Sequence, residues 1–114
     1  MRLGTLPRSI SKILGDGPDA VFYSAQTWQK IAVKHPDVDE DILSHVGSFT
    51  EHRYFEDIRS QTPSVIGLVE AGSLFKIAIK RTKRRELLIT TIHRTNQRQV
   101  RSILKKYPEI KLAQ

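Results

Sequence analysis

The amino-acid sequence predicts an α+β fold, with N-terminal helices packed on one face of an antiparallel β-meander and a closing C-terminal helix. Three observations indicate this order. Apolar residues recur at helical spacing between residues 25 and 58, three runs rich in β-branched residues occupy residues 64–94, and helical spacing returns from residue 97. Helices followed by a meander and one further helix are typical of α+β domains.

Length and composition favour a single domain over residues 1–114, with a core in about residues 20–107. Hydrophobic residues make up 39% of the chain, which is enough for one modest core and too many for a disordered protein. No apolar run approaches the roughly 20 residues of a membrane helix, the N-terminus lacks the apolar segment of a signal peptide, and there is no cysteine. We therefore expect a cytoplasmic protein with no membrane partner, no metal and no cofactor.

The first half of the chain predicts a strand and then a helix. Residues 15–20, GDGPDA, have the composition of a turn, and VFYS at residues 21–24 follows as a short strand. Ser24 is suited to cap a helix that runs to His35, and Pro36 ends that helix because the residue before a proline disfavours the α region.

Residues 37–49 predict a second helix, since an acidic first turn suits the helix dipole. SFTE at residues 48–51 matches the capping-box pattern and predicts the start of a short third helix. SQTP at residues 60–63 is a break. The expected buried stripe of the second helix is Val38, Ile42, Val46 and Phe49, and the third helix would carry Tyr54, Phe55 and Ile58.

Three strands and a helix are expected in the second half. The strand candidates are SVIGLVEAG, SLFKIAIK and ELLITTIHR, joined by a tight turn at residues 70–73 and a basic loop at residues 81–85. Asn96 is expected to cap the last helix, which Pro108 ends, and residues 107–114 form either a tail or a docking strand. Helices on one side leave the other face of the sheet open, and we expect the function there. The apolar face of the last helix is Val100, Ile103, Leu104 and Tyr107.

Alternation along the second strand places Phe75, Ile77 and Ile79 in the core and directs its lysines outward. Apolarity does not decide the phase of the third strand. One loop length places Thr90 beside Lys76, and a loop one residue longer or shorter places Thr91 and His93 on the lysine face instead.

Polar groups at the end of the third strand suit phosphodiester cleavage without a metal. Histidine can act as acid or base near neutral pH, while lysine and arginine stabilise a charged phosphorane and hydroxyls hold phosphate oxygens. A basic, solvated strand end is the ordinary alternative. The candidate catalytic residues are His35, Lys76, Thr90, Thr91, His93 and Arg94.

The histidines of the chain differ in their expected positions. His35 shares a helical face with Trp28 and Ile31, so it points toward the interior or the rim of a cleft, although a satisfied core histidine is the more frequent reading. His45 is expected to be structural or exposed, and His52 to lie on a polar helix face. No pair of histidines has a zinc-binding spacing.

The basic residues are unevenly distributed and favour a nucleic-acid partner. Residues 1–57 hold six Lys/Arg and nine Asp/Glu, a net of −3, while residues 58–114 hold thirteen and three, a net of +10. Few aromatic residues lie among these cations, which favours gripping of the phosphate backbone over base stacking. The candidate RNA-binding residues are Lys80, Arg81, Lys83, Arg84, Arg85, Arg98, Arg101 and Lys105.

Several stretches of the sequence resemble a known family. VFYSAQTWQKIAVKHPDV at residues 21–38 reads as a strand, a serine-capped helix and a His-Pro-acidic step, and it is followed by ILSHVGSF, LFKIAIK and LLITTIH. This order is similar to that of the small phage-associated nuclease-like domains grouped with the barnase, EndoU, colicin-type tRNase and RelE-like (BECR) folds, over about residues 20–105. The resemblance implies an α+β ribonuclease fold and a role for His35, Lys76 and one of Thr90 or Thr91.

The first hypothesis for function is a metal-independent endoribonuclease of a toxin or phage effector type, which cuts tRNA or another structured RNA. His35 and His93 would share proton transfer, and Lys76, Lys80 and Arg94 would stabilise the phosphorane. An antitoxin, an immunity protein or a phage protein is the expected protein partner. The alternatives are a non-catalytic nucleic-acid binder and a protein-interaction or inhibitor module that ignores RNA.

Overall fold

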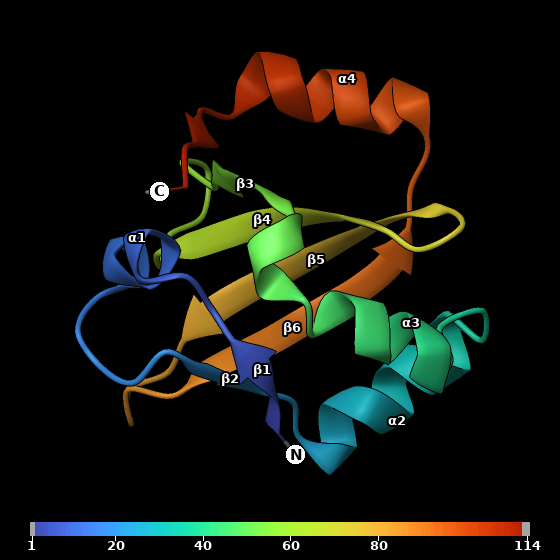
Figure 1. Cartoon of the computed structure of the whole chain (residues 1–114), viewed down its shortest axis with the longest axis horizontal. Coiled ribbons are helices and arrows are strands. Elements are labelled where there is room, and N and C mark those ends of the chain that lie inside the picture. Colours follow the sequence, from blue (N-terminus) through green and yellow to red (C-terminus); the bar gives the residue numbers. More distant parts are fainter. Residues whose placement is uncertain (1, 113–114) are drawn as a thin grey trace.

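The computed structural model describes residues 2–112 and has a seven-stranded, mostly antiparallel sheet with four α-helices, which confirms the α+β class (Figure 1). The strand order is β1-β2-β6-β5-β4-β3-β7, and only β2 and β6 pair in parallel. The strands are β1 (Arg2–Thr5), β2 (Ala20–Phe22), β3 (Arg53–Glu56), β4 (Ser64–Glu70), β5 (Leu74–Arg81), β6 (Leu87–Arg94) and β7 (Glu109–Ile110). The helices are α1 (Arg8–Ser11), α2 (Ala25–Lys34), α3 (Glu40–Val46) and α4 (Gln97–Lys106), with 3₁₀ turns η1 (Lys12–Leu14) and η2 (Phe49–Glu51).

Local capping explains where the three longer helices begin. The side chains of Ser24, Asp39 and Asn96 each accept a hydrogen bond from the backbone N–H three residues later, as helix N-caps do. The predicted caps at Ser24 and Asn96 are confirmed. The predicted stripe of the second helix is confirmed as buried, but the helix itself is shorter than predicted. Only Ile42 and Val46 lie in α3, whereas Val38 precedes its N-cap and Phe49 belongs to η2.

The predicted third helix is wrong. Its first residues form only the turn η2, the Ser48 side chain makes no capping bond, and the chain then enters strand β3. Tyr54 and Phe55 are both fully buried but lie on opposite faces of the sheet, which a strand allows and a one-sided helix does not. Ile58 is 61% exposed, so it belongs to no buried stripe.

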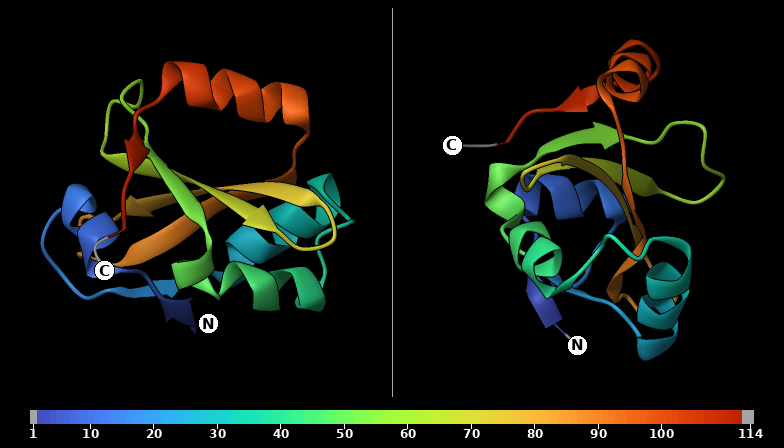
Figure 2. Two further views of the ribbon diagram at one scale, coloured as in Figure 1. Left: turned by 45° about the horizontal axis from the view of Figure 1, so that its top comes forward. Right: turned by 90° about the vertical axis from the view of Figure 1, so that its right-hand side faces the viewer.

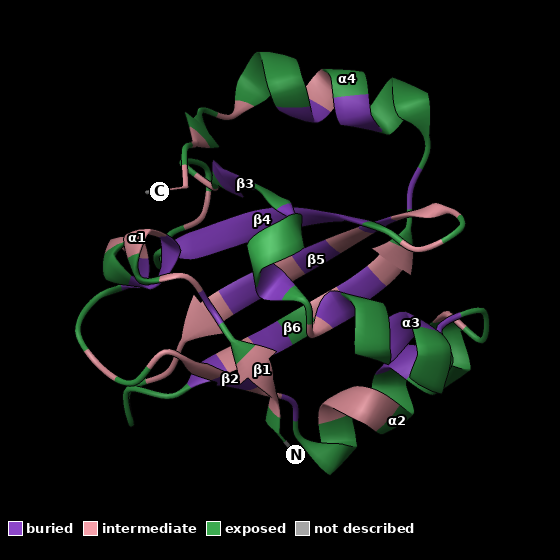
Figure 3. Cartoon of the chain, in the orientation of Figure 1, coloured by how far each residue is buried: buried purple, intermediate pink, exposed green. Residues whose placement is uncertain are grey.

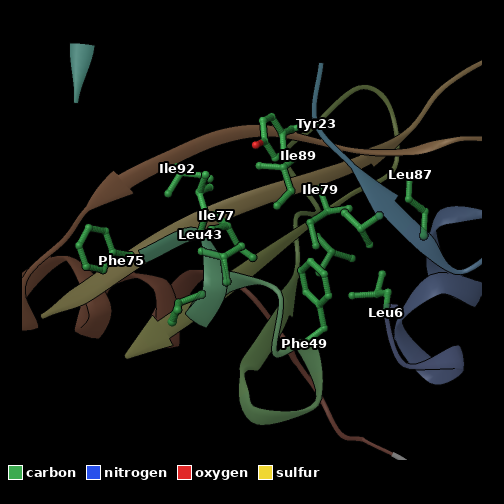
Figure 4. Close-up of a cluster of buried hydrophobic side chains, with 14 of the residues drawn as sticks. Leu6, Tyr23, Leu43, Phe49, Phe75, Ile77, Ile79, Leu87, Ile89 and Ile92 are labelled. Carbon is green, nitrogen blue, oxygen red and sulfur yellow. The ribbon is translucent and has the colours of Figure 1, made fainter. Parts of the chain in front are cut away.

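The main core lies between the sheet and the helices α1, α2 and α3 (Figure 4). It takes its strand residues mainly from β5 and β6, and Phe49, Leu43 and Tyr23 pack against them. Leu6 and Ile10 are 1% and 0% exposed, so the core begins earlier in the chain than the predicted residue 20. The N-terminal segment is therefore part of the same packed unit.

The other face of the sheet is not fully open, which corrects the prediction that helices cover one side only. Helix α4 lies across it (Figure 2), and in this layer Val100 and Ile103 pack on Phe55, Ile66 and Leu68 of strands β3 and β4. The side of α4 toward the sheet is buried and its outer side is exposed (Figure 3). The lysine face of β5 and β6 lies beyond this helix, and this part of the sheet carries the polar residues.

The predicted apolar face of the last helix is partly wrong, because Leu104 is 44% exposed. After α4 the chain returns to the sheet as β7, which pairs with β3 and is held by an ion pair of 2.7 Å between Arg53 and Glu109. A docking strand is thus the correct alternative for residues 109–110, whereas residues 113–114 of the predicted tail lie outside the described part. Within residues 2–112, no helix is long and apolar enough to cross a membrane.

Candidate functional site

A β-bulge in strand β6 decides which polar side chains face the lysines. Ala78 of β5 pairs with Thr91, whereas the next residue, Ile79, pairs with Ile89, so Thr90 is the extra residue. A bulge resets the alternation of a strand and commonly re-aims side chains next to functional sites. Thr91 and His93 therefore share the face of Lys76, which is the second of the two alternatives left open by the sequence.

His93 is the centre of the polar cluster. It lies directly across from Lys76 in the β5–β6 ladder, and its Nδ1 atom is 3.4 Å from the Thr91 hydroxyl. The His35 ring lies with its centroid 5.5 Å from that of His93. Burial lowers the pKa of His93 below its usual value of 6.5, and the nearby Lys76 and His35 charges lower it further. A neutral imidazole at neutral pH is the consequence.

Helix α2 brings His35 to this point because β2 is short. In the described part of the chain, Leu87 and Leu88 are the only residues of β6 that pair with β2, which leaves the later part of β6 without a strand on that edge. Helix α2 contacts β6 and buries Ile31 in the core. His35 is the C-cap of this helix, and its backbone N–H donates to the Ile31 carbonyl. The end of the helix thus fixes the position of the imidazole.

Two hollows flank the pair of histidines, with volumes of about 250 and 220 Å³. Neither lining contains an aspartate or a glutamate, and both contain two lysines and one histidine. We name the two hollows together the basic groove, and this set of charges is suited to an anion such as a phosphodiester. The α2 hollow is lined by Lys30, Ile31, Lys34, His35, Thr90 and Thr91, and the α4 hollow by Lys76, His93, Thr95, Gln99, Ser102, Ile103, Lys106 and Tyr107.

Sequence reasoning missed Lys30, Lys34 and Lys106 as members of the groove. The two α2 lysines are four residues apart and adjacent in sequence to Ile31 and His35, so helical periodicity alone could have placed them beside the histidine. Lys106 and the polar residues of α4 carried no comparable signal. Their position depends on how α4 crosses the sheet.

Two of the three cations expected to stabilise the phosphorane do not join the cluster. Lys80 is on the lysine face but four residues along β5 from Lys76, about 13 Å at ~3.3 Å per residue. Arg94 follows His93 and therefore alternates to the opposite face, where it is exposed. Thr90, the bulged residue, lines the α2 hollow and donates to the Ala78 carbonyl at 3.4 Å.

The basic loop between β5 and β6 lies at the other end of the strand. Arg85 is eight residues from His93, roughly 25 Å along β6. Lys83, Arg84 and Arg85 are exposed. Arg81 instead has a structural role, because its Nη1 donates to the carbonyls of Pro18 and Arg85 at 3.0 and 2.8 Å. The candidate RNA-binding surface is thus separate from the histidine pair.

The cations of the last helix also lie outside the groove. Arg98, Arg101 and Lys105 are exposed, and at 100° per residue they project away from the side on which Val100 and Ile103 meet the sheet. They form an outer ridge of α4. A nucleic acid in the groove would not contact this ridge without bending around the helix.

His45 and His52 have structural positions. His45 is exposed, as expected, and its Nδ1 is 2.9 Å from the Asp41 carbonyl. The prediction for His52 is wrong, because it is only 6% exposed and its Nε2 is 2.9 Å from the Val46 carbonyl. Burial lowers the pKa of His52.

A larger hollow of about 300 Å³ lies on the other side of α2, lined mainly by Tyr23, Trp28, Leu43 and residues of β1. Its lining contains neither histidine nor lysine, so it lacks the imidazoles and ammonium groups of the basic groove. Among residues 2–112, no group of three or more His, Asp or Glu side chains is placed to hold a metal ion. Searches of protein-family models, curated proteins and solved structures found no match to this chain.

Proposed function

We propose that the protein is a metal-independent endoribonuclease that cleaves tRNA or another structured RNA by attack of a 2′-hydroxyl on the adjacent phosphate. The observation that carries this proposal is the pair of imidazoles 5.5 Å apart in a groove that has four lysines and no carboxylate. The nearby charge of His35 disfavours protonation of His93. One charged and one neutral imidazole are what acid–base catalysis requires.

His93 is the base in this proposal, because its lowered pKa keeps it neutral at neutral pH. It accepts the 2′-hydroxyl proton while the oxygen attacks phosphorus, and His35 donates a proton to the departing 5′-oxygen. The products are a 2′,3′-cyclic phosphate and a free 5′-hydroxyl. Lys76 stabilises the charged phosphorane, and the Thr91 hydroxyl holds a phosphate oxygen.

The resemblance to the phage-associated nuclease-like domains supports the same site. It assigns roles to His35, Lys76 and a threonine of strand β6, and these three lie together in the basic groove. The toxin or phage effector type of ribonuclease is part of this proposal. It rests on the resemblance and not on the groove.

The proposal is tested by incubating the purified chain with total RNA in the presence of EDTA and analysing the new ends. We expect fragments with 2′,3′-cyclic phosphates from the wild type and none from the double variant His35→Ala/His93→Ala. Circular dichroism and melting curves check that the variant is folded. Intact RNA with the wild type, or equal cleavage by the folded double variant, contradicts the proposal.

A second candidate is a non-catalytic nucleic-acid binder. It is favoured by the exposed cations that lie away from the histidines, in the loop at residues 82–86 and on the outer ridge of α4. Such a protein binds RNA with strong salt dependence and leaves it intact after long incubation. The same RNA experiment separates the two candidates.

A further inference from the structure

The α4 hollow contains a set of polar groups that proton transfer does not use. Lys76 and His93 form its inner wall, next to the reacting phosphate of the proposed mechanism. Its outer wall is helix α4, which contributes Gln99, Ser102 and Lys106. A nucleotide whose phosphate lies at His93 would therefore place its base, or that of its neighbour, against α4.

Gln99 is held in one orientation. Its backbone N–H donates to the Asn96 side chain, and its Oε1 accepts a hydrogen bond of 2.6 Å from the Thr95 hydroxyl. Thr95 is itself buried. Because the amide oxygen is engaged, the Nε2 group remains as a double donor, and within residues 2–112 it has no hydrogen-bond partner.

The rest of the hollow is also rich in donors. The Ser102 hydroxyl has no partner within residues 2–112, and Lys106 adds a cation, while no carboxylate lines the hollow. Ile103 and Tyr107 provide apolar surface. Unpaired RNA bases are commonly bound in this way, on apolar or aromatic surface with hydrogen bonds to an exposed base edge.

We propose that the α4 hollow is a nucleobase subsite that prefers cytosine and guanine in an unpaired stretch of RNA. Cytosine presents two adjacent acceptors at O2 and N3, and guanine at O6 and N7, which match a wall of donors. Adenine and uracil alternate donors and acceptors along their edges and match it less well. The subsite rests on the proposed ribonuclease function for its substrate, but its base preference is a separate property.

The experiment is an NMR titration of the intact chain with the 5′-monophosphates of cytidine, guanosine, adenosine and uridine, and with inorganic phosphate. We expect shifts at Gln99 and Ser102, and binding of the cytidine and guanosine nucleotides about tenfold tighter than the other two, as for one well-placed set of base contacts. Equal affinity for all four nucleotides, or phosphate binding as tightly as cytidine monophosphate, overturns the subsite.

Gln99→Glu is the decisive variant, because it removes the two donors and keeps an oxygen for the Thr95 hydroxyl. The tenfold preference should disappear. Gln97→Glu is the matched control, since it makes the same change in the same helical turn but outside the hollow, and it should keep the preference. An unchanged preference in Gln99→Glu contradicts the subsite.

Failure of the subsite and failure of the proposed function are distinguishable. If the titration shows a base preference but the chain does not cleave RNA, the subsite is supported and the catalytic role is contradicted. Cleavage whose cut sites show no base preference, or the same preference in wild type and Gln99→Glu, keeps the catalytic role and removes the subsite.

Discussion

Strand β6 begins and ends among basic residues, and the two ends use their charges in different ways. At the start, the Arg81 guanidinium donates to the carbonyls of Pro18 and Arg85 and ties the loop to the N-terminal segment. At the end, Lys76 and His93 lie side by side, and the Lys76 ammonium has no acidic partner within residues 2–112.

The two ends of β6 differ in which of their cations are available to bind an anion. The loop has more positive charges in the sequence than the histidine end. Its most buried cation, Arg81, is nevertheless bound to backbone carbonyls, and its other cations are exposed to solvent. The histidine end has fewer charges, but they converge from α2, β5 and β6 without neutralisation. Convergence of unpaired charges indicates an anion site, whereas a run of charges does not.

The largest expected effect is that of His93→Ala at the histidine end. Loss of the base should lower the cleavage rate about 10²–10⁴-fold with little change in stability. In the wild type the rate should fall as the pH drops below the lowered pKa of His93, since protonation removes the base. Rates from pH 4.5 to 8 check this. His45→Ala, which removes an exposed imidazole of α3, is the control and should cleave normally.

Lys76→Met should have the next largest effect, about 10²-fold on the cleavage rate, because one stabiliser of the phosphorane is lost. It should also raise the pKa of His93, since the Lys76 charge lowers that pKa. The acid limb of the pH–rate profile then moves to higher pH. Lys80→Met removes the same charge from the same face farther along β5, and an equal shift there would contradict the assignment.

Arg81→Met changes the loop end of β6, where we expect an effect on stability. The carbonyls of Pro18 and Arg85 lose their donor, and we expect the free energy of unfolding to fall by about 1–3 kcal/mol. Cleavage by the folded protein should be unchanged. Gly17→Ala should act in the same direction, because its φ is +148° and a Cβ there would lie 2.5 Å from the Arg81 Nη1. Urea unfolding measures the stability of both variants. An Arg81→Met protein that is as stable as the wild type but does not cleave RNA would contradict the structural role of Arg81.

Stability should also depend on pH through His52. Its folded pKa lies below 6.5, so the unfolded chain binds more protons and the free energy of unfolding decreases as the pH falls below 6.5 toward the folded pKa. His93 contributes with the same sign. The variant His52→Gln should show a shallower decrease between pH 7 and 5. An equal decrease in the variant would assign the effect to other groups.

The smallest effect is expected from neutralising the exposed loop. The triple variant Lys83→Gln/Arg84→Gln/Arg85→Gln should cleave at the wild-type rate at low salt and change the salt dependence only slightly. The pair Lys30→Gln/Lys34→Gln in the groove should lower the salt slope by about 0.7 for each phosphate of a single strand that the variant no longer neutralises. A larger change of the salt slope in the loop variant than in the groove variant would indicate that RNA binds at the loop.

Much of the fold could be predicted because it depends on local signals. The meander β4–β6 and the helices follow hydrophobic periodicity and capping residues such as Ser24 and Asn96, which lie within a few residues of the structure they determine. The prediction of a third helix was wrong because Tyr54 and Phe55 pack into two different cores, on opposite faces of the sheet. Neighbouring apolar residues do not reveal that they will face opposite ways.

The candidate site was only partly predictable. The residue types at the end of β6 and at His35 indicated acid–base chemistry, but the bulge at Thr90 is a one-residue irregularity that no periodicity predicts. Which cations lie in the basic groove depends on how distant elements pack. This packing leaves Lys80 and Arg94 out of the groove and brings Lys30 and Lys106 into it. Sequence spacing alone therefore does not predict which of these residues belong to the site.

The contact between His35 and His93 joins residues that are 58 positions apart, and this has a consequence for synthesis. A ribosome releases helix α2 well before strand β6, and the first imidazole has no counterpart during that interval. A truncated or unfinished chain therefore lacks the assembled pair. On the proposed function, RNA cleavage would begin only after strand β6 has been synthesised and has folded against helix α2.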